Sequence, residues 1–145
     1  MNPLEDLRMW KMLTAAALLL IVTAGCATSQ DPQSVVESYF AAWNTRNVDD
    51  TMAYVADDAS LELDQLGVMR EGIEDIRDGF EAMFSRSEWT IEVSDFETDG
   101  DRVNYNYVIL SPSGGELEKG RSEATIKDGR IVSEELVGLY RQPSN

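Results

Sequence analysis

The hydrophobic residues of this chain follow helical spacing in its first half and strand spacing in its second half. Between residues 33 and 47, apolar side chains recur every three or four positions, as on one face of a helix. Asp31 and Pro32 precede this segment as N-cap and first helical residue, since proline lacks only an N–H that would be unpaired there. A short second helix is predicted over residues 49–55, and a third helix begins after Gly72.

From Trp89 onward, the apolar residues alternate with polar ones, which is typical of strands. Strand spacing is seen in residues 59–64, 89–93, 103–109 and, more loosely, 131–139. The pairs Asp99-Gly100 and Asp128-Gly129 favour tight hairpin turns. Three helices followed by a four-stranded antiparallel meander predict an α+β fold with the helices packed on a sheet.

The first 25 residues are typical of a secretory signal peptide. Two basic residues precede an apolar run over residues 12–24, whose thirteen positions are fewer than the roughly 20 that a membrane-spanning helix needs. The run ends in Thr23-Ala24-Gly25-Cys26, which resembles the lipobox of bacterial lipoproteins. This resemblance implies that residues 1–25 are removed and that Cys26 becomes a lipidated N-terminus.

The predicted cleavage divides the rest of the chain into a lipidated cysteine with a short tether, residues 26–31, and one domain, residues 32–141. A plain signal peptide with a chance cysteine is the alternative. Ala27 stands where an Asp would resemble the bacterial inner-membrane retention signal. We therefore expect a cell-envelope protein attached to the membrane through Cys26, on the outer membrane facing the periplasm when the host has two membranes.

The composition excludes several kinds of site and partner. The 145 residues include no His, one Cys, 27 acidic and 12 basic side chains, which gives a formal net charge of −15. Histidine-based catalysis is therefore excluded, and a single Cys cannot form an internal disulfide or a cysteine zinc site. The acidic excess argues against nucleic acid as a partner, because phosphate recognition needs a basic surface. We expect neither a metal nor a cofactor.

Three segments carry a family resemblance: residues 39–50 (YFAAWNTRNVDD), 54–62 (YVADDASLE) and 71–80 (EGIEDIRDGF). They resemble the nuclear transport factor 2-like superfamily, which includes SnoaL-like cyclases and ketosteroid isomerases. The resemblance implies a cone-shaped fold, in which a curved sheet wraps around the first helix and forms a pocket. It also implies a homodimer formed through the exposed sheet face. Because function on a shared fold depends on the site, the resemblance does not identify an activity.

The ketosteroid isomerases of this superfamily use a Tyr and a protonated Asp to hold an oxyanion, and a second Asp as base. By position, the Tyr corresponds to Tyr39 and the second oxyanion donor falls near Ser122. The base corresponds to Leu63, which cannot take a proton, so we do not expect ketosteroid isomerisation. Glu62 and Asp64 alternate with leucines expected in the core, so both acids are expected to face water.

Six aromatic residues are candidates for lining a ligand pocket, because such pockets are mostly apolar. They are Tyr39, Trp43, Phe80, Phe84, Tyr105 and Tyr107. Their spacing explains them equally well as core. We expect a domain that binds a small apolar molecule or an envelope protein without catalysis. One alternative is a small-molecule isomerase, cyclase or dehydratase that uses Tyr39 with an acid such as Asp64, and another is an assembly module whose pocket is filled by its own side chains.

Overall fold

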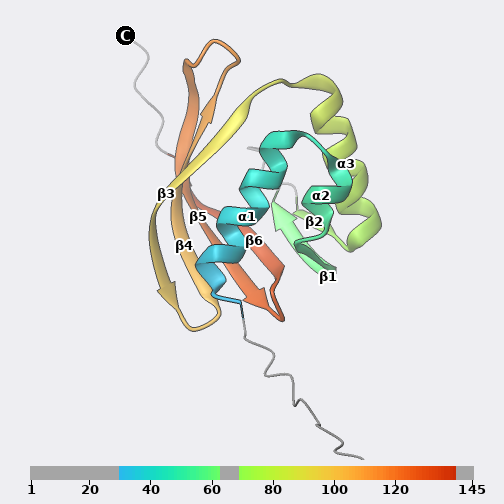
Figure 1. Ribbon diagram of the computed structural model, residues 1–145, viewed down its shortest axis with the longest axis vertical. Helices are drawn as coiled ribbons and strands as arrows, with labels where there is room; N and C mark the ends of the chain where they lie inside the picture. The colour runs from blue at the N-terminus through green and yellow to red at the C-terminus, as the bar shows by residue number, and fades with distance from the viewer. Residues whose placement is uncertain (1–29, 63–68, 140–145) are drawn as a thin grey trace, which may run out of the picture.

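The structure, a computed structural model, describes residues 30–62 and 69–139, which form three helices and one six-stranded sheet (Figure 1). The helices are α1 (Pro32–Thr45), α2 (Val48–Met52) and α3 (Ile73–Arg86). The strands are β1 (Val55–Glu62), β2 (Met69–Glu71), β3 (Thr90–Asp99), β4 (Arg102–Leu110), β5 (Glu116–Lys127) and β6 (Arg130–Leu139). The predicted α+β fold is confirmed.

The sheet has the strand order β2-β1-β6-β5-β4-β3, and only the β1–β6 pair is parallel. Strands β3 to β6 form the predicted meander, bend strongly and enclose α1 on their concave side (Figure 1). Both predicted tight turns occur between strands. The turn between β5 and β6 has positive φ at Asp128 (52°) and Gly129 (73°), as a type I′ hairpin requires.

Helix α1 begins where its sequence predicts and ends at Thr45, two residues before the end of the helical spacing in the sequence. The Asp31 side chain accepts a hydrogen bond from the Ser34 backbone N–H at 3.1 Å, which satisfies one free donor of the first turn. Arg46 ends the helix in the left-handed conformation (φ 61°). The apolar face of α1 is buried against the sheet, and aromatic side chains of α3 pack against it. In the described ranges, no helix is long and apolar enough to cross a membrane.

The region after α2 differs from the prediction. Val55, expected at the end of the second helix, is the first residue of β1, and the short strand β2 was not predicted. Five steps along β1, from Val55 to Ser60, match only two steps along β6, from Ile131 to Ser133, so β1 contains a large bulge. Asp57 and Asp58 lie exposed in this bulge and interrupt the apolar alternation. Because of that interruption, the alternation of apolar and polar residues does not reveal where the strand begins.

Strand β6 contains two extra residues relative to β5, Val132 and Val137, and the first of them changes which side chains face inward. Ile131 pairs with Ile126 and Ser133 pairs with Thr125, so Val132 has no partner on β5. Such a bulge turns the residues that follow it by one position. Between Ser133 and Leu136, the inward side of β6 therefore changes from odd-numbered to even-numbered residues, and the second register shift follows at Val137.

Burial along β6 agrees with this change of phase. Ile131 is fully buried, and beyond the bulge Glu134 is buried and Leu136 half-buried. Val137, which simple alternation places on the inner face together with Ile131, is 58% exposed. The expected alternation is therefore wrong for Val137, and Glu134 takes an inward position that its polarity does not predict.

Candidate functional site

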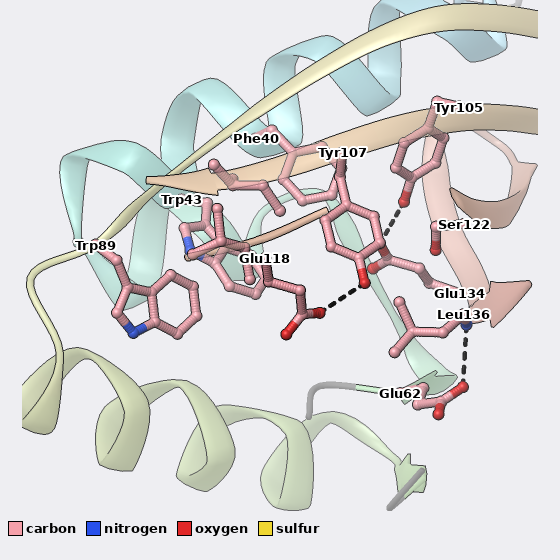
Figure 2. A pocket seen from close by; sticks show the side chains of 12 residues that line it. Phe40, Trp43, Glu62, Trp89, Tyr105, Tyr107, Glu118, Ser122, Glu134 and Leu136 are labelled. Atoms are coloured by element: carbon pink, nitrogen blue, oxygen red, sulfur yellow. Dashed lines mark hydrogen bonds between the residues drawn. The ribbon is translucent and has the colours of Figure 1, made fainter. Parts of the chain in front are cut away.

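A cavity of about 60 Å³ lies between α1 and the concave face of the sheet (Figure 2). It is lined by Phe40, Trp43, Glu62, Trp89, Ile91, Tyr105, Tyr107, Ile109, Glu118, Ser122, Glu134 and Leu136. We call the fully buried part around Tyr105 and Glu134 the deep end. The half-buried part around Glu62, Trp89 and Glu118 is the mouth. The cavity is several times smaller than the roughly 300–1,000 Å³ pockets that enclose drug-sized ligands.

Regular spacing along α1 and β4 supplies the aromatic walls. Phe40 and Trp43 lie three residues apart on the buried face of α1. Tyr105 and Tyr107 alternate on the inner face of β4. Asn44 ties the end of α1 to the start of β3, because its side chain donates to the Ile91 carbonyl at 2.8 Å and accepts from the Ile91 N–H at 2.9 Å. These two bonds fix the end of α1 against the mouth.

Glu134 is a carboxyl group at the deep end and is only 7% exposed. The hydroxyl of Tyr105, itself fully buried, donates a hydrogen bond to Glu134 Oε1. Burial raises the pKa of Glu134 to about 7, the hydrogen bond from Tyr105 lowers it, and the nearby charge of Glu62 raises it. A carboxyl group with this pKa is able to accept or donate a proton near neutral pH.

Tyr39 lies behind the cavity rather than on its surface. Its side chain is fully buried, and its hydroxyl makes no hydrogen bond of good geometry with any described residue. Burial raises the Tyr39 pKa well above its usual value, and the charge of Glu134 raises it further. Its ring packs edge-on against Phe40 and Trp43, with centroids 4.8 Å and 5.9 Å away.

Two more carboxylates stand at the mouth. Glu118 Oε1 accepts a hydrogen bond from the Tyr107 hydroxyl at 2.8 Å, and Glu62 Oε2 accepts one from the Leu136 N–H at 3.0 Å (Figure 2). The expectation that Glu62 faces water is therefore wrong. The reason is that β1 and β6 stop pairing after Leu61, and Glu62 binds the backbone N–H of β6 that this leaves open.

The structure divides the six aromatic candidates into two groups. Trp43, Tyr105 and Tyr107 line the cavity. Phe80 and Phe84 of α3 pack against Trp43 from outside the cavity, with centroids 5.0 Å and 6.0 Å away. Tyr39 belongs to this second group.

The other sequence candidates lie either at the cavity or outside the described residues. Ser122 lines the cavity, and its hydroxyl donates to the Glu135 carbonyl at 2.8 Å. Cys26, Leu63 and Asp64 lie outside the described residues.

Sequence reasoning missed Glu134 and Glu118. Alternation counted from Ile131 places Glu134 outside, and only the bulge in β6 reverses this. For Glu118 the sequence does hold a signal, because Ala124 and Ile126 are apolar residues at even positions of β5. The same phase places Glu118 on the inner face.

The cavity is acidic, but its acids are not arranged as metal ligands. In the part of the chain that the structure describes, no three acidic side chains are placed to hold a metal ion. The lining chemistry is therefore a carboxyl group with a near-neutral pKa, two further carboxylates, and aromatic walls.

Comparison with known proteins identifies the family of this domain and solved structures with a similar fold. Residues 36–134 match the SnoaL-like domain family. A candidate polyketide cyclase from Sinorhizobium meliloti is 25% identical, with 71% of this chain and 93% of that chain covered and a TM-score of 0.62. An NTF2-like protein of unknown function from Cytophaga hutchinsonii is 18% identical (74% and 89% covered, TM-score 0.61). A candidate SnoaL-like isomerase from Agrobacterium tumefaciens is 20% identical (70% and 92% covered, TM-score 0.59).

No curated protein sequence matches this chain. The solved structures share its α+β NTF2-like fold, with three helices against a mostly antiparallel sheet. The family match covers more than half of the chain, including most of α1, strands β3 to β5, and β6 as far as Glu134. The chain therefore belongs to the SnoaL-like domain family.

Proposed function

We propose that the cavity binds part of a small, largely apolar molecule and that Glu134 moves a proton on it. The reaction class would be isomerisation, cyclisation or dehydration. The observation that carries the proposal is Glu134, a buried carboxyl group with a pKa of about 7 at the end of an aromatic cavity. The cyclase and isomerase named among the similar structures support these reaction classes. Asp64, the acid suggested by sequence, lies outside the described residues.

Because Tyr105 binds only one oxygen of Glu134, the two oxygens have different roles: one holds the side chain in place and the other transfers the proton. Oε1 is held by the Tyr105 hydroxyl, which leaves Oε2 without a hydrogen bond of good geometry among the described residues. In its ionised form, Oε2 accepts a proton from a carbon next to a substrate carbonyl and returns it to another carbon. A positioned acid–base group of this kind contributes about 10²- to 10⁴-fold in rate.

Binding without chemistry is the second candidate, and the aromatic lining supports it. Phe40, Trp43 and Trp89 offer apolar surface without any proton-transferring group. This candidate predicts that small apolar molecules bind equally well whether or not position 134 carries a carboxyl group.

The isomerisation of cyclopent-3-enone to cyclopent-2-enone tests the two candidates, because it moves one proton and is followed by ultraviolet absorbance. We expect turnover by the full-length protein to rise with pH through about 7 as Glu134 ionises. Glu134→Gln should lose at least about 100-fold in rate, the lower limit for a lost acid–base group. Glu135→Gln is the matched control, since Glu135 is the exposed neighbour.

Either of two results would overturn proton transfer at Glu134. One is equal turnover by Glu134→Gln and wild type. The other is binding of the ketone, seen as a shift of the Trp43 and Trp89 indole signals, without any turnover by wild type. The second result would support the binding candidate.

We also propose that Cys26 carries lipid after removal of residues 1–25, with residues 26–31 as a tether and 32–141 as the domain on the envelope membrane. The sequence before Cys26 supports this. Mass spectrometry of the protein in bacterial membranes should find a chain that begins at Cys26 with added acyl groups. Cys26→Ser should keep its leader and take up no labelled fatty acid; labelling of this variant would contradict the proposal.

A further inference from the structure

We propose that the ligand of this cavity carries a primary ammonium group, which sits at the mouth against Glu118 while a short hydrocarbon body points toward Glu134. This inference deepens the function proposed above, since it concerns the same cavity and names the chemical class of its ligand. It depends on the charge, the aromatic surfaces and the free acceptor atoms of the cavity.

The charge of the lining is of one sign. Glu62, Glu118 and Glu134 all line the cavity, and no Lys or Arg is among the described residues that do. A carboxylate or phosphate ligand would meet three acids and no compensating cation, which is strongly unfavourable at low dielectric. A cationic ligand would instead be attracted by the acids of the lining. Because no three of the described acids are placed to hold a metal ion, the cation that fits is an organic one.

The aromatic rings of the mouth also favour a cation. Trp43 and Trp89 lie with their ring centroids 6.0 Å apart. Figure 2 shows the Glu118 carboxylate between Trp89 and Tyr107. The face of an indole ring attracts an ammonium group electrostatically, most strongly where water is excluded. Glu118 and the two indoles therefore offer a carboxylate and cation-binding ring faces in one place.

Each acid of the cavity keeps an acceptor atom available. Among the described residues, one oxygen of each carboxylate accepts a hydrogen bond: from Tyr107 for Glu118, from Leu136 for Glu62, and from Tyr105 for Glu134. Within residues 30–62 and 69–139, no hydrogen bond reaches the second oxygen of any of the three. A primary ammonium group has three N–H donors and no acceptor, so it suits such oxygens. A neutral hydroxyl group offers only one donor.

The size of the cavity and the charge of the chain agree with a small cation. A volume of about 60 Å³ admits a short hydrocarbon body but not a whole drug-sized molecule. The formal net charge of −15 attracts cations over a distance and increases their rate of encounter with the protein.

Three ligands of one shape test the inference: 3-methylbutylamine, 3-methylbutan-1-ol and 3-methylbutanoate. They share one branched hydrocarbon body and differ in the head group, which is a cationic ammonium, a neutral hydroxyl or an anionic carboxylate. Binding to the full-length chain in mild nonionic detergent is followed by the indole N–H signals of Trp43 and Trp89. We expect the amine to bind at least about tenfold more tightly than the alcohol, and the carboxylate not to bind.

Glu118→Gln should remove the preference for the amine and leave the affinity for the alcohol unchanged. The Gln side chain can still accept the Tyr107 hydrogen bond, so the fold should be retained. Glu135→Gln removes the same charge from an exposed position on the same sheet and should bind all three ligands like wild type. Amine binding no tighter than that of the alcohol, or an equal loss in Glu118→Gln and Glu135→Gln, would overturn the inference.

The failure of this inference is distinct from failure of the proposed function. Cyclopent-3-enone turnover that depends on Glu134, without any preference for the amine, overturns the ammonium site alone. A preference for the amine that depends on Glu118, with turnover unaffected in Glu134→Gln, overturns proton transfer alone.

Discussion

Glu134 is a carboxyl group whose ionised form loses most of its contact with water when the chain folds. Only one hydrogen bond of good geometry, from Tyr105, compensates it among the described residues. A buried carboxyl group that is not fully compensated lowers the stability of the folded state once it ionises in the unfolded chain. The residue that gives the cavity its reactivity is therefore also a source of pH-dependent instability.

Replacement of Glu134 by Gln should change how stability depends on pH. The pKa of this carboxyl group is about 7 in the folded protein and 4.5 without burial, so folding loses stability as pH rises from about 4.5 to about 7. At 1.36 kcal/mol per pKa unit the loss is about 3 kcal/mol. Glu134→Gln should gain that much relative to wild type between pH 4.5 and pH 8, measured by urea unfolding. Glu135→Gln should show no such gain, and parallel wild-type and Glu134→Gln curves would contradict the prediction.

The two buried tyrosines should influence Glu134 unequally. Tyr105 donates to the carboxylate, and a hydrogen bond to the ionised form lowers the pKa. Tyr105→Phe should therefore raise the Glu134 pKa above about 7, as measured by carbon-13 NMR titration of the carboxyl group. Tyr39→Phe should raise it less, because the Tyr39 hydroxyl has no hydrogen bond of good geometry with any described residue. A larger shift in Tyr39→Phe would contradict this order.

At the scale of elements, bulges determine how the sheet curves and which side chains line the cavity. Asp95 is an extra residue in β3, because three steps from Ser94 to Glu97 match two steps on β4. Its backbone is left-handed (φ 53°), and its carboxylate accepts a hydrogen bond from the Asn106 amide at 2.9 Å. Bulges of this kind increase twist and bend the strand, which helps the sheet to curve around α1.

Substitution at Asp95 should reveal how strongly the bulge depends on its backbone. A β-branched residue is strongly disfavoured in the left-handed region, whereas Gly adopts it freely. Asp95→Val should destabilise the protein by about 1–2 kcal/mol. The free energy of unfolding of Asp95→Gly should stay within about 1 kcal/mol of wild type. The reason is that glycine adopts this backbone conformation without strain, which offsets the loss of the hydrogen bond with Asn106. Equal stabilities of the two variants in urea unfolding would show that the bulge does not depend on φ at this residue.

The elements also show how far sequence reasoning reached. The capping of α1 by Asp31 and the Asp128-Gly129 turn could be predicted because each depends on residues close together in the chain. The start of β1, the strand β2 and the inward position of Glu134 could not, because they depend on pairing between distant strands. For the site, alternation found Tyr105 and Tyr107, but the β6 bulge placed Glu134 beside them.

At the scale of the whole molecule, the outer face of the sheet is open to a partner. We propose, from the family resemblance, that two copies pair through this face. Leu117 on β5 and Val137 on β6 are 60% and 58% exposed, and they give these strands apolar side chains outside the core.

Sedimentation of the full-length protein in mild detergent should give the mass of a dimer. Val137→Lys should shift it toward the monomer, because a charge in a protein interface is costly when it has no partner. A monomeric wild type would contradict this proposal.

The length of α1 sets the distance between the first described residues and the mouth of the cavity. Gln30 lies against the β5–β6 turn, its Oε1 2.8 Å from where a Cβ on Gly129 would be. Trp43 lies near the other end of α1, eleven residues after Pro32 and therefore about 17 Å along a helix that rises about 1.5 Å per residue. Glu118 is the third residue of β5 and therefore lies at the end of that strand opposite the turn. With lipid on Cys26, the turn would point toward the bilayer and the mouth toward the water above it. The cavity would then collect dissolved molecules rather than extract lipids.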